Sequence, residues 1–157
     1  MKDTHGSVLE MWHSYLDSIG ETIESTDETF ASWHFEITKE GANNLANLVL
    51  TGKKKATAAS LWVEKYDHGV IPKKGDYSII TDWEGRAKCI IQTTKIDIVP
   101  YDEVTAEFAA IEGEGDQSLD YWRKVHLEYY KKECKRIGKV FTPRMPVICE
   151  IFEVVYK

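Results

Sequence analysis

The residues whose types could carry out chemistry are concentrated in Gly52-Lys53-Lys54-Lys55-Ala56-Thr57, between two helical patterns. A lysine three residues before a threonine can bring an amine and a hydroxyl to the same side of one turn. Together they could activate a nucleophile or bind an anion. Lys54 and Thr57 are therefore the first candidates for a functional site, and Lys53 and Lys55 form their positively charged surroundings. The alternative interpretation is a solvated helix end, where cations favour the C-terminal dipole.

The lysine segment is not a P-loop. A P-loop requires a glycine five residues before the Gly-Lys pair and a serine or threonine directly after the lysine. Here those positions are Asn47 and Lys54, and no parallel strand is predicted before them.

A second candidate cluster is the stretch Glu112-Gly113-Glu114-Gly115-Asp116-Gln117-Ser118. It is too acidic and too rich in glycine for regular structure, and Ser118 opens a predicted long helix. The inner face of that helix is predicted to carry Leu119, Trp122, Val125, His126, Tyr129 and Tyr130. The alternative is an ordinary loop before a helix N-terminus, with Trp122 and His126 as core residues.

Composition limits what these clusters can do. The chain has 157 residues and a formal net charge of -6. One domain of this length can bury a real core, and an acidic chain is a poor non-specific binder of nucleic acid. The three cysteines have no paired spacing, which favours buried free thiols over disulfides or a zinc site. The N-terminus lacks a signal peptide and no segment reaches membrane-spanning length, so a cytoplasmic protein with no membrane partner is expected. A homodimer is also compatible with the sequence.

The predicted elements are mixed, with helices before strands and no alternation typical of parallel sheets. Helices are expected from Ser7 to Gly20, from Thr38 to Gly52, over 60–67, over 102–110 and from Ser118 onward, and strands over 33–37, 77–81, 87–99 and 147–156. This order indicates an α+β fold with a small barrel.

Both candidate clusters resemble motifs of one family. Gly52 to Thr57 resembles the Gly-x-Lys-x-x-Thr signature of ASCH domains, which are related to the PUA family of RNA-binding barrels. The acidic stretch, followed by Trp122 and His126, resembles the second hallmark of a bacterial subgroup of similar length. The resemblance covers roughly Trp33 to Lys157. It implies one PUA-like domain over 1–157, with an N-terminal helical extension (1–30) and a core (31–157).

The resemblance implies a small β-barrel flanked by helices, with a cleft lined by the lysine segment and the acidic loop. Some small bacterial members are amidohydrolases that remove the acetyl group from acetylcytidine with a lysine, a threonine and a glutamate. Others bind or cleave RNA. Carried over by position, the catalytic set is Lys54, Thr57 and Glu112, with Glu114 as the competing acid. The implied binding residues are Lys53, Lys55, Glu114, Ser118 and Trp122. One departure is Ala59, where many members carry an arginine two residues after the threonine.

The role of Lys54 depends on its distance from the acidic loop. Lysine can take a proton from threonine only if its pKa falls from about 10.4 toward 7, as burial or nearby positive charge can cause. A glutamate in a tight ion pair works against this, and Lys54 would then bind an anion or stabilise charge.

Two functional hypotheses follow. The first is an amidohydrolase acting on a modified nucleoside such as acetylcytidine. The second is a non-catalytic RNA- or nucleotide-binding module, or an RNA-cleaving member of the family. The expected partner is a small nucleoside, a nucleotide or RNA, and neither hypothesis requires a cofactor or a metal.

Overall fold

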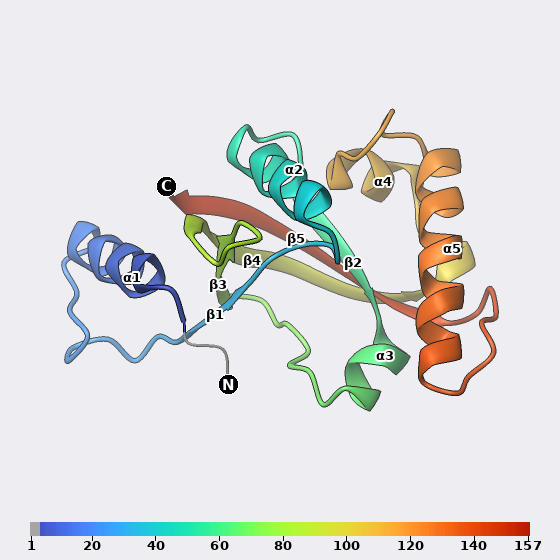
Figure 1. The fold of residues 1–157 in the computed structure, drawn as a ribbon, viewed down its shortest axis with the longest axis horizontal. Coiled ribbons are helices and arrows are strands. Elements are labelled where there is room, and N and C mark those ends of the chain that lie inside the picture. Colours follow the sequence, from blue (N-terminus) through green and yellow to red (C-terminus); the bar gives the residue numbers. More distant parts are fainter. Residues whose placement is uncertain (1–3) are drawn as a thin grey trace. The chain divides into compact units, whose positions relative to one another are not determined.

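The computed structural model describes residues 4–157 (Figure 1). Its helices are α1 (Gly6–Ser18), α2 (Lys39–Leu50), α3 (Leu61–Tyr66), α4 (Ala106–Glu112) and α5 (Leu119–Arg136), with a short 3-10 helix at Tyr101–Glu103. Its strands are β1 (Phe30–Trp33), β2 (Ala56–Ser60), β3 (Tyr77–Thr81), β4 (Ala87–Pro100) and β5 (Pro146–Tyr156).

The strands form one mixed sheet in the order β1-β3-β4-β5-β2. β1 pairs with β3 in parallel, whereas β3 with β4 and β2 with β5 are antiparallel. The α+β prediction is confirmed. The predicted closed barrel is not confirmed, because within residues 4–157 the strand order ends at β1 on one side and at β2 on the other.

The chain divides into two compact units. The first comprises the chain up to Gly52, Gly75–Thr93 and Phe152–Lys157, and the second comprises Lys53–Lys74 and Thr94–Ile151. The long strands β4 and β5 each contribute to both units. The proposed single domain with a helical extension over 1–30 stays a prediction.

In the first unit, α1 covers part of β3 and β4. Its buried residues meet two strand isoleucines in one apolar cluster of Val8, Trp12, Tyr15, Leu16, Ile79 and Ile90. Burial of aromatic and branched side chains of this kind stabilises the fold by about 1.5–3 kcal/mol per side chain. α2 begins at the predicted cap, where the Thr38 side chain accepts a hydrogen bond from the backbone of Gly41 at 3.1 Å.

In the second unit, α4 and α5 pack with β2 and the first half of β5. Their shared core contains Ala56, Tyr101, Val104, Phe108, Ala109, Trp122, Tyr130, Cys134, Met145, Val147 and Cys149. Ser118 caps α5 as predicted, since its side chain accepts a hydrogen bond from Tyr121 N at 3.0 Å. Cys89, Cys134 and Cys149 are all buried and free, which confirms the prediction for the thiols.

Several element predictions were wrong in detail. The first strand ends at Trp33, because Glu36 adopts a left-handed φ of 62° and Ile37 is 75% exposed. The strand β2 was not predicted, and α4 is capped by Thr105, not by Asp102.

The predicted inner face of α5 also included residues that are not buried. Its buried residues are Trp122, His126, Tyr130 and Cys134, four residues apart, whereas Val125 and Tyr129 are 41% and 46% exposed. None of the helices within residues 4–157 combines the length and apolar character needed to cross a bilayer.

Candidate functional site

Two backbone segments of the second unit lie against each other and bring the two candidate clusters together. The backbone N–H of Lys55 donates to the carbonyl of Ile111 at 2.9 Å. Beside this bond, a Cβ atom added to Gly113 would lie only 1.9 Å from the carbonyl oxygen of Lys53. Gly113 also has a left-handed φ of 74°, which favours glycine. The close approach places Lys54 directly opposite Glu112 and Glu114.

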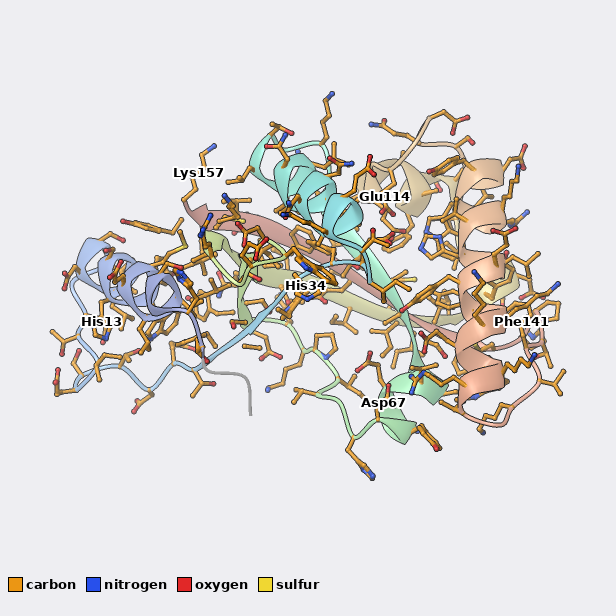
Figure 2. The ribbon with its side chains drawn as sticks, viewed as in Figure 1. His13, His34, Asp67, Glu114, Phe141 and Lys157 are labelled. Atoms are coloured by element: carbon orange, nitrogen blue, oxygen red, sulfur yellow. The ribbon has the colours of Figure 1, made fainter. Side chains whose placement is uncertain are left out.

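Lys54 is a buried cation between two carboxylates. Its side chain is 1% exposed, and its Nζ lies 3.6 Å from Oε1 of Glu112 and 3.7 Å from Oε2 of Glu114. Glu114 lies on the loop that follows α4 (Figure 2). The predicted convergence of Lys54 with the acidic loop is therefore present, and both candidate acids take part in it.

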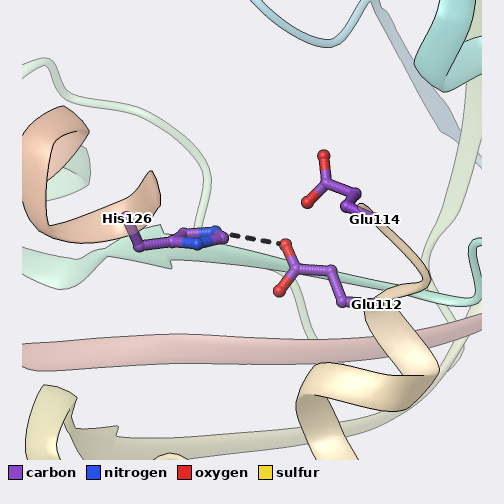
Figure 3. A group of neighbouring side chains, drawn as sticks. All are labelled: Glu112, Glu114 and His126. Atoms are coloured by element: carbon purple, nitrogen blue, oxygen red, sulfur yellow. Dashed lines mark ion pairs between the residues drawn. The ribbon is translucent and has the colours of Figure 1, made fainter. Parts of the chain in front are cut away.

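Glu112 is held on three sides. Its Oε2 accepts a hydrogen bond from the indole Nε1 of Trp122, and its Oε1 lies 3.3 Å from Nε2 of His126 (Figure 3). Burial alone would raise the pKa of Glu112. The hydrogen bond with His126, the charges of Lys54 and His126 and the Trp122 bond outweigh burial, so the pKa lies below its ordinary value. Glu112 is therefore a fixed anion.

His126 is oriented so that both of its ring nitrogens face acceptors. Nδ1 lies 2.8 Å from the carbonyl oxygen of Trp122, and Nε2 faces the Glu112 carboxylate. A carbonyl and a carboxylate can only accept, so this arrangement favours the protonated ring, in which both nitrogens donate. Burial opposes this charge, but the hydrogen bond and charge of Glu112 outweigh it and raise the pKa of His126. The ring also stacks on Trp122, with centroids 4.1 Å apart.

Glu114 differs from Glu112 in exposure and in its partners. Its side chain is 22% exposed, compared with 3% for Glu112. Burial, the charge of Glu112 and a hydrogen bond with Glu112 raise the pKa of Glu114, with Lys54 opposing them. The two neighbouring carboxyls are thus shifted in opposite directions, an arrangement typical of acid–base pairs.

The geometry favours an electrostatic role for Lys54. Two carboxylates lie within 4 Å of Nζ, so the side chain is placed as the positive partner of two ion pairs. The distances fit the role predicted for Lys54 in an ion pair with a glutamate. In that role, Lys54 binds an anion or stabilises developing charge.

Donor atoms of Glu112, Glu114 and His126 lie within 4.8 Å of one another, close enough to share a metal ion. Nε2 of His126 is directed at Glu112. The Lys54 ammonium already supplies positive charge to both carboxylates. The cluster as arranged is balanced by protein cations.

Thr57 is placed differently from the prediction. It lies inside β2, so it does not share a turn with Lys54, and its register partner in β5 is Glu150. Strand alternation puts Thr57 on the opposite face from Ala56 and Ala58, which contact the core under α4 and α5.

The remaining predicted binding residues lie around the cluster in different roles. Lys53 and Lys55 are exposed, Ser118 caps α5, and Trp122 is 3% exposed with its indole N–H bonded to Glu112. Trp122 is therefore a positioning residue within the core. His126 was not among the predicted site residues, although its spacing of four residues from Trp122 was the signal that both would face the acidic loop.

Comparisons with known proteins identify the family of the chain. A model of the ASCH domain matches residues 31–156. The chain therefore belongs to the ASCH domain family, whose PUA-like fold is associated with RNA binding. No curated protein matches the chain significantly.

Two solved structures resemble the whole chain. An ASCH domain from Lactobacillus crispatus JV V101 is 30% identical, with 100% of this chain and 99% of that chain covered and a TM-score of 0.89. Protein EF3133 from Enterococcus faecalis V583 is 34% identical, with 96% and 88% covered and a TM-score of 0.82. The hypothetical protein PH0355, at 20% identity, 81% and 100% coverage and a TM-score of 0.51, is similar in fold alone.

Proposed function

We propose that this protein is a hydrolase that cleaves the amide of a modified nucleoside such as acetylcytidine, at the site formed by Lys54 and Glu112. The observation that supports the proposal is the burial of Lys54, Glu112 and His126 in one charged cluster. Removing charges from water costs several kcal/mol per ion. Apolar side chains of similar volume in place of a buried ion pair often give equal or greater stability, so the charges are not needed for folding. Buried charges with carboxyl pKa values shifted apart are typical of functional sites.

The chemistry assigned to the cluster is charge stabilisation during amide cleavage. In the overall reaction, the oxygen of water is added to the acyl carbon, the carbon–nitrogen bond breaks, one water proton passes to the leaving amine and the other is released, which gives acetate and the unmodified base. Negative charge develops on the acyl oxygen during the attack. The Lys54 ammonium would stabilise that oxygen, and Glu112 keeps Lys54 in position.

Thr57 enters the proposal from the family resemblance alone, as a nucleophile that would carry the acyl group before water removes it. Thr57→Val removes the hydroxyl and preserves the shape of the side chain. Loss of acetate release with unchanged nucleoside binding would assign the attack to Thr57. Retained turnover would assign it to water.

The experiment that tests the proposal is acetate release from acetylcytidine. The wild-type protein should release acetate, and Lys54→Ala should reduce the rate at least a hundredfold, since loss of one charge-stabilising donor costs a factor of about 100–1000. Lys65→Ala changes an exposed lysine of α3, outside the proposed site, and should keep the wild-type rate. Absence of turnover by the wild-type protein, or full turnover by Lys54→Ala, would refute the proposal.

The second candidate is a non-catalytic RNA- or nucleotide-binding module. The exposure of Lys53 and Lys55 on either side of Lys54 favours it, because exposed lysines can contact phosphates. RNA affinity should then fall steeply with salt concentration. A flat salt response with tight nucleoside binding would favour the hydrolase.

A further inference from the structure

We propose that the Glu114 side chain is a displaceable counter-ion, which an oxyanion of the ligand replaces at Lys54. The inference rests on the proposed function in taking Lys54 as the residue that contacts the ligand. The oxyanion has two sources with the same chemistry: the charged oxygen that develops on an acyl group, or a phosphate oxygen of a nucleotide.

The contacts of the two glutamates separate their roles. Glu112 is held by Trp122, His126 and Lys54 and is almost fully buried. Glu114 contacts Lys54 at 3.7 Å, and its side chain is 22% exposed. Both carboxylates lie beyond the range of about 2.7–3.2 Å for an N–H···O hydrogen bond from Nζ, so exposure and the additional partners of Glu112 distinguish the two. Of the two carboxylates, Glu114 is the one that a ligand can reach and replace.

The charges of the cluster make this exchange favourable. When His126 is protonated, Lys54 and His126 are cations, and Glu112 supplies one negative charge. One positive charge then remains, which ionised Glu114 neutralises. If the Glu114 side chain turns outward, the cluster has a net positive charge in a largely buried place. An incoming anion restores the balance, because unpaired buried charge is costly.

The backbone on either side of Glu114 is closely packed. Gly113 lies against the Lys53 carbonyl, and a Cβ atom added to Gly115 would lie 2.3 Å from the Tyr121 ring. Both glycines have a left-handed φ. The backbone therefore has no room to shift toward either neighbour. Rotation of the partly exposed Glu114 side chain would carry its carboxylate away from Lys54 without a shift of this backbone.

The exchange should be coupled to a proton. The charged groups that face Glu114 are Lys54, Glu112 and His126. Burial and the charge of Glu112 raise the pKa of Glu114, so protonation begins at a higher pH than for a free carboxyl. Protonated Glu114 no longer neutralises Lys54. Anion binding should therefore strengthen as the pH falls and should be accompanied by proton uptake.

Sulfate is a suitable probe because its charge is constant between pH 5 and pH 8. Titration calorimetry in two buffers of different ionisation enthalpy would give both the affinity and the number of protons taken up. We expect wild-type protein to bind sulfate more tightly at pH 5.5 than at pH 8. Glu114→Gln should bind at least ten times more tightly than wild type at pH 8 and should take up fewer protons.

Three variants control this measurement. Glu107→Gln makes the same charge change at an exposed position of α4 and should behave as wild type. Glu114→Asp keeps the charge on a shorter side chain and should bind with intermediate affinity, so a folding defect in Glu114→Gln would not prevent the test. Lys54→Ala should not bind sulfate. Equal affinity of Glu114→Gln and Glu107→Gln, or no sulfate binding by any variant, would overturn the inference.

Two further comparisons identify the source of the oxyanion. If the ligand supplies a phosphate, cytidine monophosphate should bind Glu114→Gln much more tightly than cytidine does. If the acyl oxygen is the source, the two should bind equally and sulfate should inhibit acetate release. Sulfate exchange without acetate release would support this inference and refute the proposed hydrolase. Acetate release by the wild-type protein, with an unchanged sulfate affinity in Glu114→Gln, would support the hydrolase and refute this inference.

Discussion

Nζ of Lys54 lies 3.6 Å from Oε1 of Glu112, and the two side chains are 1% and 3% exposed. An ion pair removed from water to this degree is stable only when further hydrogen bonds satisfy both ions. Trp122 and His126 provide those bonds to Glu112. In the sequence, Lys54 is the middle residue of three consecutive lysines. In the structure, it lies at the centre of a buried charge cluster.

Lys54→Met should destabilise the protein. It removes one cation and leaves Glu112 ionised with two of its three partners. Loss of one partner of a buried pair costs about 3–5 kcal/mol, and the remaining donors should keep the loss near 3 kcal/mol. Urea denaturation measures this loss in the free energy of unfolding. Lys55→Met is the exposed control and should stay within about 0.5 kcal/mol of wild type; equal stability of the two variants would contradict a buried pair.

Trp122→Phe isolates the indole hydrogen bond. The ring still stacks on His126, but Glu112 loses a donor. A buried acceptor without its partner costs about 1–3 kcal/mol. The pKa of Glu112, followed by carboxyl carbon NMR, should rise because one stabilising bond to the charged form is gone. An unchanged pKa would mean that Trp122 does not position this carboxylate.

His126→Gln should have an effect on stability that depends on pH. The folded-state pKa of His126 is raised, so the stability it contributes is fully present below its unfolded pKa of about 6.5 and is lost as the pH rises through the folded value. The free energy of unfolding lost in His126→Gln should therefore be larger at pH 5.5 than at pH 9. His13→Gln, at an exposed position, is the control. An equal loss at both pH values would show that His126 acts through packing alone.

Gly113→Ala tests the contact between the two backbone segments. A Cβ atom there would overlap the Lys53 carbonyl, whereas Gly138 has a similar φ of 76° and nothing within 4 Å of an added Cβ. Gly138→Ala should cost about 1–2 kcal/mol for its left-handed backbone. Gly113→Ala should cost clearly more and should also lower nucleoside affinity, because it separates Lys54 from the acidic loop. Similar unfolding midpoints for the two variants would contradict this.

The pairing of Lys54 with the acidic loop could be predicted because both motifs resemble one family and chain order brings them into one fold. The choice between Glu112 and Glu114 could not be made, because a glycine-rich loop has no periodicity that fixes its register. In the structure both glutamates contact Lys54: Glu112 is a buried, fixed anion, and Glu114 is a partly exposed one.

β2 could not be predicted because Ala56-Thr57-Ala58-Ala59-Ser60 has little strand propensity of its own. Its pairing with β5, a long-range contact, determines its conformation. The wrong place assigned to Thr57 followed from that omission. The exposure of Val125 and Tyr129 could not be predicted either. Apolar residues on a helix do not show how much of its surface other elements cover.

A crystal structure of the protein soaked with acetylcytidine tests the central claim most directly. We predict the acyl oxygen, or the acetate oxygen that replaces it, within hydrogen-bond distance of Nζ of Lys54. Glu112 should keep its bonds to Trp122 and His126, and Glu114 should be turned away from Lys54. A nucleoside bound elsewhere, with the Lys54 cluster unchanged, would contradict the account.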